Sequence, residues 1–170
     1  MIYEVDRYYW NEQTFDCHKA ELAVARILSR WAESFEARLL APAKGVAETR
    51  RAGQLPAEAA ERAAMAEELV SWIHENSQTS NLFYLMLRAP GDTSPQLFDH
   101  HDTGSAWYLQ LSKEQAGVLA EELAKEGLPA DLFYPSDDTV YVPYKLFGFI
   151  PFGDKLYSPK QWAARQAAKN

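Results

Sequence analysis

The chain of 170 residues has the length of one compact domain, and its 47% apolar and 24% charged residues are typical of a globular protein. The net charge of −7 argues against a general phosphate-binding surface, because such a surface needs clustered Lys and Arg. Cys17 is the single cysteine, so an internal disulfide and a thiolate zinc cluster are both excluded.

The first ten residues, MIYEVDRYYW, lack the pattern of a signal peptide, because no basic segment precedes a long apolar core. No run approaches the roughly 18 consecutive apolar residues that a membrane-spanning helix requires. We therefore expect a cytoplasmic protein that does not contact a membrane.

The first half of the chain predicts one strand and two helices. β-Branched and aromatic residues predict a strand over 2–10. Apolar residues at steps of three and four then predict a helix from Phe15 to Leu40, ended by Pro42. We interpret 41–55 as a loop and expect a second helix from Pro56, so the two helices would form an αα-hairpin. The apolar face of the first helix comprises Val24, Ile27, Leu28, Trp31, Phe35 and Leu39.

The second half predicts a buried strand and a well-delimited helix. Residues 82–87 are nearly all apolar, which is typical of a central strand covered on both faces. A further strand is expected over about 105–111. Ser112 and Gln115 form a capping box that starts a helix over 113–126, and Gly127 ends it.

The C-terminal part predicts strands over 130–134 and 139–144, followed by an aromatic tail over 146–157 that covers the core without regular pairing. A second capping box at 158–161 predicts a last short helix. The element order predicts an α+β fold: a four- or five-stranded antiparallel sheet in ferredoxin-like βαββαβ order, its first helical slot expanded to the αα-hairpin. We predict one α+β domain over 1–144, with an aromatic and basic extension over 145–170 packed on it.

The tetrapeptide Asp99-His100-His101-Asp102 is the candidate metal site. Aspartate and histidine are ligands for zinc or manganese, and a metal-dependent hydrolase or nuclease centred here is one hypothesis. A site needs further ligands, however, and His18 and His74 do not belong to a recognised ligand spacing. We therefore favour a solvated polar turn without a cofactor, on the loop between the second and third predicted strands.

Cys17 and His18 are adjacent, but neighbours on a helix point about 100° apart and cannot act on each other as nucleophile and base. A structural cysteine is the preferred interpretation. The nucleotide-binding and nucleophile-elbow motifs GxxxxGK[ST], GxGxxG and GxSxG do not occur in the sequence, which lowers the expectation of an enzyme.

Basic and aromatic residues alternate in the last 26 residues, a combination that can bind single-stranded nucleic acid by charge and base stacking. We rank nucleic acid below a protein partner, because such aromatics more often pack over a sheet edge. The candidate nucleic-acid contacts are Lys145, Lys155, Lys160, Trp162 and Arg165.

Acidic residues on the predicted helices suggest a protein partner. The small, acidic and motif-poor chain fits a protein that acts by binding. The leading hypothesis is a non-enzymatic binding protein that masks or inhibits a basic partner, as immunity or anti-defence proteins of bacteria and phages do. An alanine-rich helix also allows a homodimer. The candidate partner-binding residues are Glu33, Glu36, Glu58, Glu61, Glu67 and Glu68.

Overall fold

The computed structural model describes residues 1–11, 14–40, 49–76, 81–90, 96–101, 106–146, 148 and 150–169. At 11, 40, 49, 81–83, 96, 99–101, 106, 145–146 and 150–152 it describes the backbone alone.

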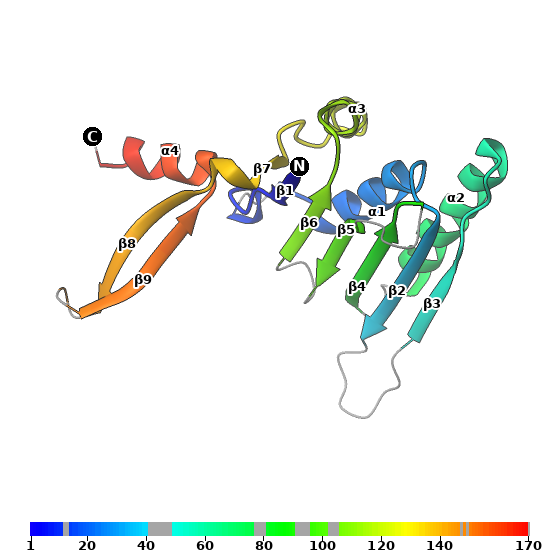
Figure 1. The fold of residues 1–170 in the computed structure, drawn as a ribbon, viewed down its shortest axis with the longest axis horizontal. Coiled ribbons are helices and arrows are strands. Elements are labelled where there is room, and N and C mark those ends of the chain that lie inside the picture. Colours follow the sequence, from blue (N-terminus) through cyan, green and yellow to red (C-terminus); the bar gives the residue numbers. More distant parts are fainter. Residues whose placement is uncertain are drawn as a thin grey trace.

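The fold is of the mixed α+β class, as predicted, with a seven-stranded antiparallel sheet in the order β3-β2-β4-β5-β6-β1-β7 (Figure 1). Its strands are β1 (Ile2–Val5), β2 (Ser34–Leu40), β3 (Thr49–Gln54), β4 (Asn81–Arg88), β5 (Gln96–His101), β6 (Ala106–Gln110) and β7 (Phe133–Pro135). Three helices accompany this sheet: α1 (Cys17–Leu28), α2 (Ala59–Asn76) and α3 (Lys113–Lys125). Two short 3-10 turns, η1 (Tyr9–Asn11) and η2 (Ser136–Asp138), lie beside its β1–β7 edge.

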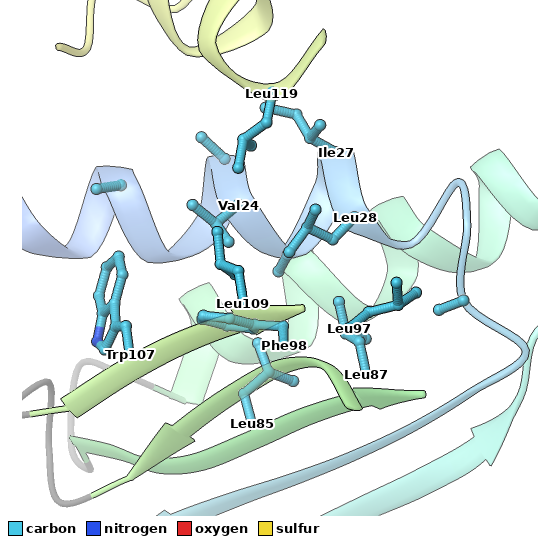
Figure 2. Close-up of a cluster of buried hydrophobic side chains, with 14 of the residues drawn as sticks. Val24, Ile27, Leu28, Leu85, Leu87, Leu97, Phe98, Trp107, Leu109 and Leu119 are labelled. Carbon is cyan, nitrogen blue, oxygen red and sulfur yellow. The ribbon is translucent and has the colours of Figure 1, made fainter. Parts of the chain in front are cut away.

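The core lies between the sheet and the helices, and α1 is sandwiched between the strands and α3 (Figure 2). Val24 and Leu28 of α1 point toward the sheet, where they meet the row Leu87, Phe98 and Leu109. Ile27 points the other way, toward Leu119 of α3. Each of these side chains is at most 2% exposed, so α1 is the central buried element of the molecule.

The predicted αα-hairpin and the ferredoxin-like order are wrong. Residues 34–40 form β2 instead of continuing a helix, and residues 49–54 form β3 instead of a loop. The two helices are therefore separated by a pair of strands, and the main sheet gains one edge from them.

The error has a specific physical cause. Phe35, Ala37 and Leu39 are buried, whereas Glu36 and Arg38 between them are only half-buried, so this segment alternates with a period of two. A step of four residues, such as that from Phe35 to Leu39, fits both a helical face and one face of a strand. The apolar pattern of α1 could therefore be extended by mistake across Ser34.

Strand β4 confirms the prediction of a central strand at 82–87, since it lies between β2 and β5 in the interior of the sheet. Leu85 and Leu87 are fully buried under the helices. On the opposite face Tyr84 donates a hydrogen bond to the Met86 sulfur at 3.3 Å, and Met86 is 6% exposed. The helices thus cover one face of this strand, whereas the other face is only partly covered, since Tyr84 there is half-buried. The predicted cover on both faces is therefore incomplete.

Both predicted capping boxes are present. The Ser112 hydroxyl accepts a hydrogen bond from the backbone N–H of Gln115, and the Gln115 side chain returns to the backbone N–H of Ser112. Ser158 and Gln161 repeat this arrangement at the start of α4 (Pro159–Ala167). Gly127, with φ of 72°, ends the α3 segment in the left-handed region that suits glycine.

The C-terminal segment forms a separate projecting unit, which we call the arm. It consists of the antiparallel hairpin of β8 (Val140–Leu146) and β9 (Ile150–Tyr157), with α4 at its base (Figure 1). The predicted irregular tail over 146–157 is therefore wrong, because Tyr141 to Leu146 pair regularly with Ile150 to Leu156. The predicted domain boundary after residue 144 falls inside β8.

Candidate functional site

The tetrapeptide at 99–102 does not form a turn throughout. Asp99, His100 and His101 belong to β5, which pairs on both sides with β4 and β6. The backbone of His100 lies in register between Leu85 and Trp107. Asp102 lies outside the described residues, as do the side chains of the other three. The predicted polar turn is therefore wrong for Asp99, His100 and His101, which are in a strand.

A metal centre is not visible in the described part of the chain. Among the described side chains, no group of three His, Cys, Asp or Glu residues is arranged to hold a metal ion. The metal hypothesis for 99–102 remains a prediction, because the side chains that it requires are not among those described.

Cys17 is the first residue of α1, directly after the N-cap Asp16. Burial, followed by the carboxylates of Glu21 and Asp16, raises the pKa of the Cys17 thiol from 9.0 to about 12. A thiol with this pKa is protonated at neutral pH and is a poor nucleophile. The geometry thus supports a structural role for Cys17.

The structure brings together two histidines that sequence spacing did not connect. The Nε2 atom of His18, in the first turn of α1, lies 3.3 Å from Nδ1 of His74, in the last turn of α2. The ring centroids are 5.6 Å apart with planes inclined by 20°, and Glu21 Oε2 lies 3.4 Å from the other nitrogen of His18. This end-to-end arrangement lets one imidazole donate to the other and links the two helix ends. Antiparallel packing of α1 and α2 places the start of one helix beside the end of the other, and this arrangement could have predicted the contact.

The predicted acidic contact residues do not share one helical surface. Glu33 is exposed in the turn before β2, and Glu36 lies in β2, so neither belongs to the first helix as predicted. Glu36 Oε1 accepts from Arg38 at 2.7 Å and lies 3.0 Å from Arg50 Nη2. The hydrogen bond from Arg38 and the charge of Arg50 hold the pKa of Glu36 below its usual value.

The four remaining glutamates lie at or on α2, but three have internal partners. Glu58 accepts from the backbone N–H groups of Ala60 and Glu61 and so caps the helix. Glu67 pairs with Arg26 at 2.6 Å, and Glu68 with Arg51 at 3.4 Å. Of these four, Glu61 alone makes neither an ion pair nor a side-chain cap within the described residues. The helices therefore present less uncompensated charge than the sequence suggests.

One face of the arm carries cations stacked on aromatic rings. The Lys155 ammonium lies 4.4 Å from the centroid of the Tyr144 ring. The Arg165 guanidinium lies 5.2 Å from the Tyr157 ring centroid and donates to the Tyr157 hydroxyl at 2.8 Å. Trp162 packs against the same tyrosine at 5.8 Å. Neither Lys155 nor Arg165 forms an ion pair with a described carboxylate.

The other face of the hairpin carries its most exposed apolar side chains. Tyr141 and Leu156 are opposite each other in register and are 62% and 61% exposed. Leu156 also borders an open hollow of about 370 Å³ between β9, α4 and the N-terminal segment. Its lining consists of Tyr8, Leu156, Tyr157, Gln161, Ala164 and Arg165.

Two residues of the arm, Ser158 and Lys160, fasten it to the main domain. The buried Ser158 hydroxyl donates to the carboxylate of Asp6. Lys160 donates to Asp131 at 2.6 Å and to the Tyr9 hydroxyl. Burial alone would lower the pKa of Lys160, but the bonds to Asp131 and Tyr9 outweigh it and raise that pKa. Lys160, a predicted nucleic-acid contact, is therefore an internal anchor, and the side chain of Lys145 is not described.

Comparison of the chain with protein-family models, with curated proteins and with solved structures gave no match. Within the described residues, none of the helices combines the length and the apolar character needed to cross a membrane.

Proposed function

We propose that the protein binds another protein through the arm and acts by occupying a surface of that partner. The observation that carries this proposal is the exposure of Tyr141 and Leu156, which lie side by side in register on a projecting hairpin. Their exposed fractions are the highest among the large apolar side chains that the structure describes. Burial of such a pair at the centre of an interface is a common source of binding energy.

The construction of the arm supports the same proposal. A two-stranded hairpin alone is marginally stable in water, because it buries little apolar surface. Helix α4 adds no residue that is fully buried, and the firm contacts of the arm are at its base, through Ser158 and Lys160. A partner that covers the hairpin would supply the missing apolar contacts.

Charge indicates the chemistry of the partner. Residues 140–169 contain five Lys or Arg residues and one acidic residue, Asp154, in a chain whose net charge is −7. Lys155 and Arg165 lie over aromatic rings, are exposed, and form no ion pair with a described carboxylate. We therefore propose an acidic protein surface as the partner, in place of the basic partner expected from the helical glutamates. The masking or inhibitory role proposed from the sequence is kept, with the arm as its contact surface.

The experiment places a photo-crosslinking amino acid at Leu156 and, as a control, at Tyr108, which is 41% exposed on the main sheet. Crosslinking in cells of the source organism identifies the partner, which is then purified. Its affinity is compared between the wild type, the Tyr141→Ala/Leu156→Ala variant and a Tyr108→Ala variant. We expect a weakening of about tenfold or more for the arm variant and little change for the control.

Two outcomes would overturn the proposal. One is a purified partner whose affinity is the same for the wild type and the arm variant. The other is salt-sensitive binding of labelled oligo(dT) or oligo(U) that is lost in Lys155→Ala/Arg165→Ala, without a protein crosslink at position 156. The second result would assign the arm to single-stranded nucleic acid.

A further inference from the structure

A second candidate site lies on the opposite side of the molecule from the hairpin, between α1 and α2. The structure contains a cavity of about 410 Å³ there, within the range of about 300–1,000 Å³ that small-molecule sites occupy. Four alanines and four charged residues line it: Ala57, Ala59, Ala63, Ala66, Arg26, Arg30, Arg62 and Glu67. This cavity shares none of its lining with the arm.

The cavity exists because the side chains of α2 change in size along the helix. In its second half Leu69, Val70 and Ile73 are at most 5% exposed and fill the space beneath the helix. In the first half Ala59 and Ala63 line the cavity and remain exposed. The small alanine side chains therefore leave an open hollow at the surface between the two helices, where larger side chains would fill the space. Its walls are the alanine methyl groups and the aliphatic parts of the arginine side chains.

The three arginines differ in how their charge is compensated. Arg26 pairs with Glu67 at 2.6 Å and with Glu126 at 3.2 Å, and Arg30 pairs with Glu122 at 3.0 Å.

Arg62 has a different set of partners. Its guanidinium donates to the backbone carbonyl oxygens of Pro56 at 2.7 Å, Arg30 at 2.9 Å and Ala57 at 3.4 Å. Among the described residues it has no carboxylate partner. The three carbonyls fix the guanidinium beside the cavity, and none of the described carboxylates balances its positive charge.

We propose that this cavity binds a small organic acid with an apolar body, whose carboxylate pairs with Arg62 and whose hydrocarbon part covers the alanines. A guanidinium that is already held in place loses little conformational entropy when it binds an anion. An apolar body is required because the alanine wall offers no side-chain hydrogen-bond donor or acceptor. The site is independent of the protein-binding proposal, since its lining and that of the arm do not overlap.

The test uses two probes. One is the fluorescent sulfonate 8-anilinonaphthalene-1-sulfonate, and the other is decanoate, which is added to displace it. We expect saturable fluorescence with one probe per chain, displaced by decanoate at a concentration about tenfold or more below that of decanol. Ala63→Phe fills the cavity and is expected to weaken both probes about tenfold or more. Ala64→Phe is the matched control, because Ala64 is exposed on the same helix and does not line the cavity.

Arg62→Gln tests the anion contact and is expected to remove the preference for decanoate over decanol, while Arg62→Lys keeps part of it. Circular dichroism and thermal unfolding confirm that each variant is folded. Equal displacement by decanol and decanoate in the wild type would overturn the proposal, as would probe binding that is unchanged in Ala63→Phe. If Arg62→Gln does not fold, the Ala63 and Ala64 variants and the decanol comparison decide the question.

Discussion

The Ser158 hydroxyl donates a hydrogen bond to the Asp6 carboxylate, so the first turn of the arm helix is joined to the end of β1 across 152 positions of the chain. Both residues are buried, with exposed fractions of 4% and 3%. The same Ser158 oxygen accepts from the backbone N–H of Gln161 at 3.1 Å, and Asp6 also accepts from the backbone N–H of Tyr8 at 2.9 Å. One hydroxyl thus caps α4 and also supplies one of the hydrogen bonds that the buried Asp6 carboxylate requires.

Ser158→Ala is expected to destabilise the protein by about 2–3 kcal/mol, because it removes a helix cap and leaves Asp6 with one donor fewer. Urea unfolding measures the change, and we expect hydrogen exchange of the β8–β9 amides to show that the arm opens before the main domain. Ser158→Thr keeps the hydroxyl and should recover most of the loss. A change below about 0.5 kcal/mol in the alanine variant would contradict the anchoring role.

Gly53 lies in register with Phe35 on the adjacent strand, and a side chain at Gly53 has no room. A Cβ atom there would be 3.1 Å from Phe35 Cε1 and 3.3 Å from Cζ. Gly53→Ala must displace this buried ring, and we expect a loss of about 1–3 kcal/mol in the free energy of unfolding. Gly117→Ala is the control, because it meets no atom within 4 Å and lies in α3, where alanine should stabilise by about 0.5–1 kcal/mol. Equal effects in the two variants would contradict the steric argument.

Short-range signals in the sequence predicted the elements whose boundaries are set locally. The helix that begins after Ser112 is delimited by a capping box at one end and Gly127 at the other, and both features act within a few residues. The strand at 82–87 is marked by its own continuous apolar composition. Such elements can be located without knowing what packs against them.

Elements defined by distant partners were not predictable in this way. Whether Phe35 belongs to a helix or a strand depends on its pairing with Leu87 and Gly53, which sequence periodicity does not specify. The same holds for the candidate sites. The His18–His74 contact and the Glu67–Arg26 and Glu68–Arg51 pairs join separate elements, so residue spacing along one helix did not reveal them.

Charge reversal on α2 is expected to have different costs at different glutamates. Glu67→Lys removes the ion pair with Arg26 and places two cations together, so we expect a loss of about 0.5–1 kcal/mol. Glu61→Lys should change stability by less than about 0.5 kcal/mol, because Glu61 is exposed and forms no ion pair within the described residues. Urea unfolding of the two variants at low and high salt distinguishes them, since added salt should reduce the Glu67 effect. Equal stability of the variants would show that the Arg26 pair contributes nothing.

Cys17 is expected to be unreactive in the folded protein at pH 8, because burial raises the pKa of its thiol to about 12. Ellman's reagent should react slowly with the native chain and rapidly in urea. The raised pKa also predicts an alkaline loss of stability: the thiol's contribution is complete below its ordinary pKa of 9.0 and declines as pH rises toward 12. Cys17→Ala should lack this component of the alkaline decline. Rapid labelling of the native wild type would contradict the half-buried, protonated state.

The placement of His100 and His101 in β5 changes the effect on stability that we expect when both histidines are replaced by alanine. A double substitution to alanine in such a turn would cost well under about 1 kcal/mol. In an interior strand, alanine has a lower β-propensity, and the backbone of His100 lies in register between the buried residues Leu85 and Trp107. We therefore expect His100→Ala/His101→Ala to cost more than about 1 kcal/mol in urea unfolding.

Metal analysis of the same variant tests the metal hypothesis separately from stability. Zinc, manganese and nickel are measured in the purified wild type, in His100→Ala/His101→Ala and in His18→Ala/His74→Ala. His18 and His74 bind each other through ring nitrogens 3.3 Å apart, so their removal is a matched control for loss of two imidazoles. Stoichiometric metal that is lost in the 100/101 variant and kept in the control would assign a metal to β5. A stability change below about 1 kcal/mol, without metal, would instead show that neither β5 histidine contributes to packing of the sheet.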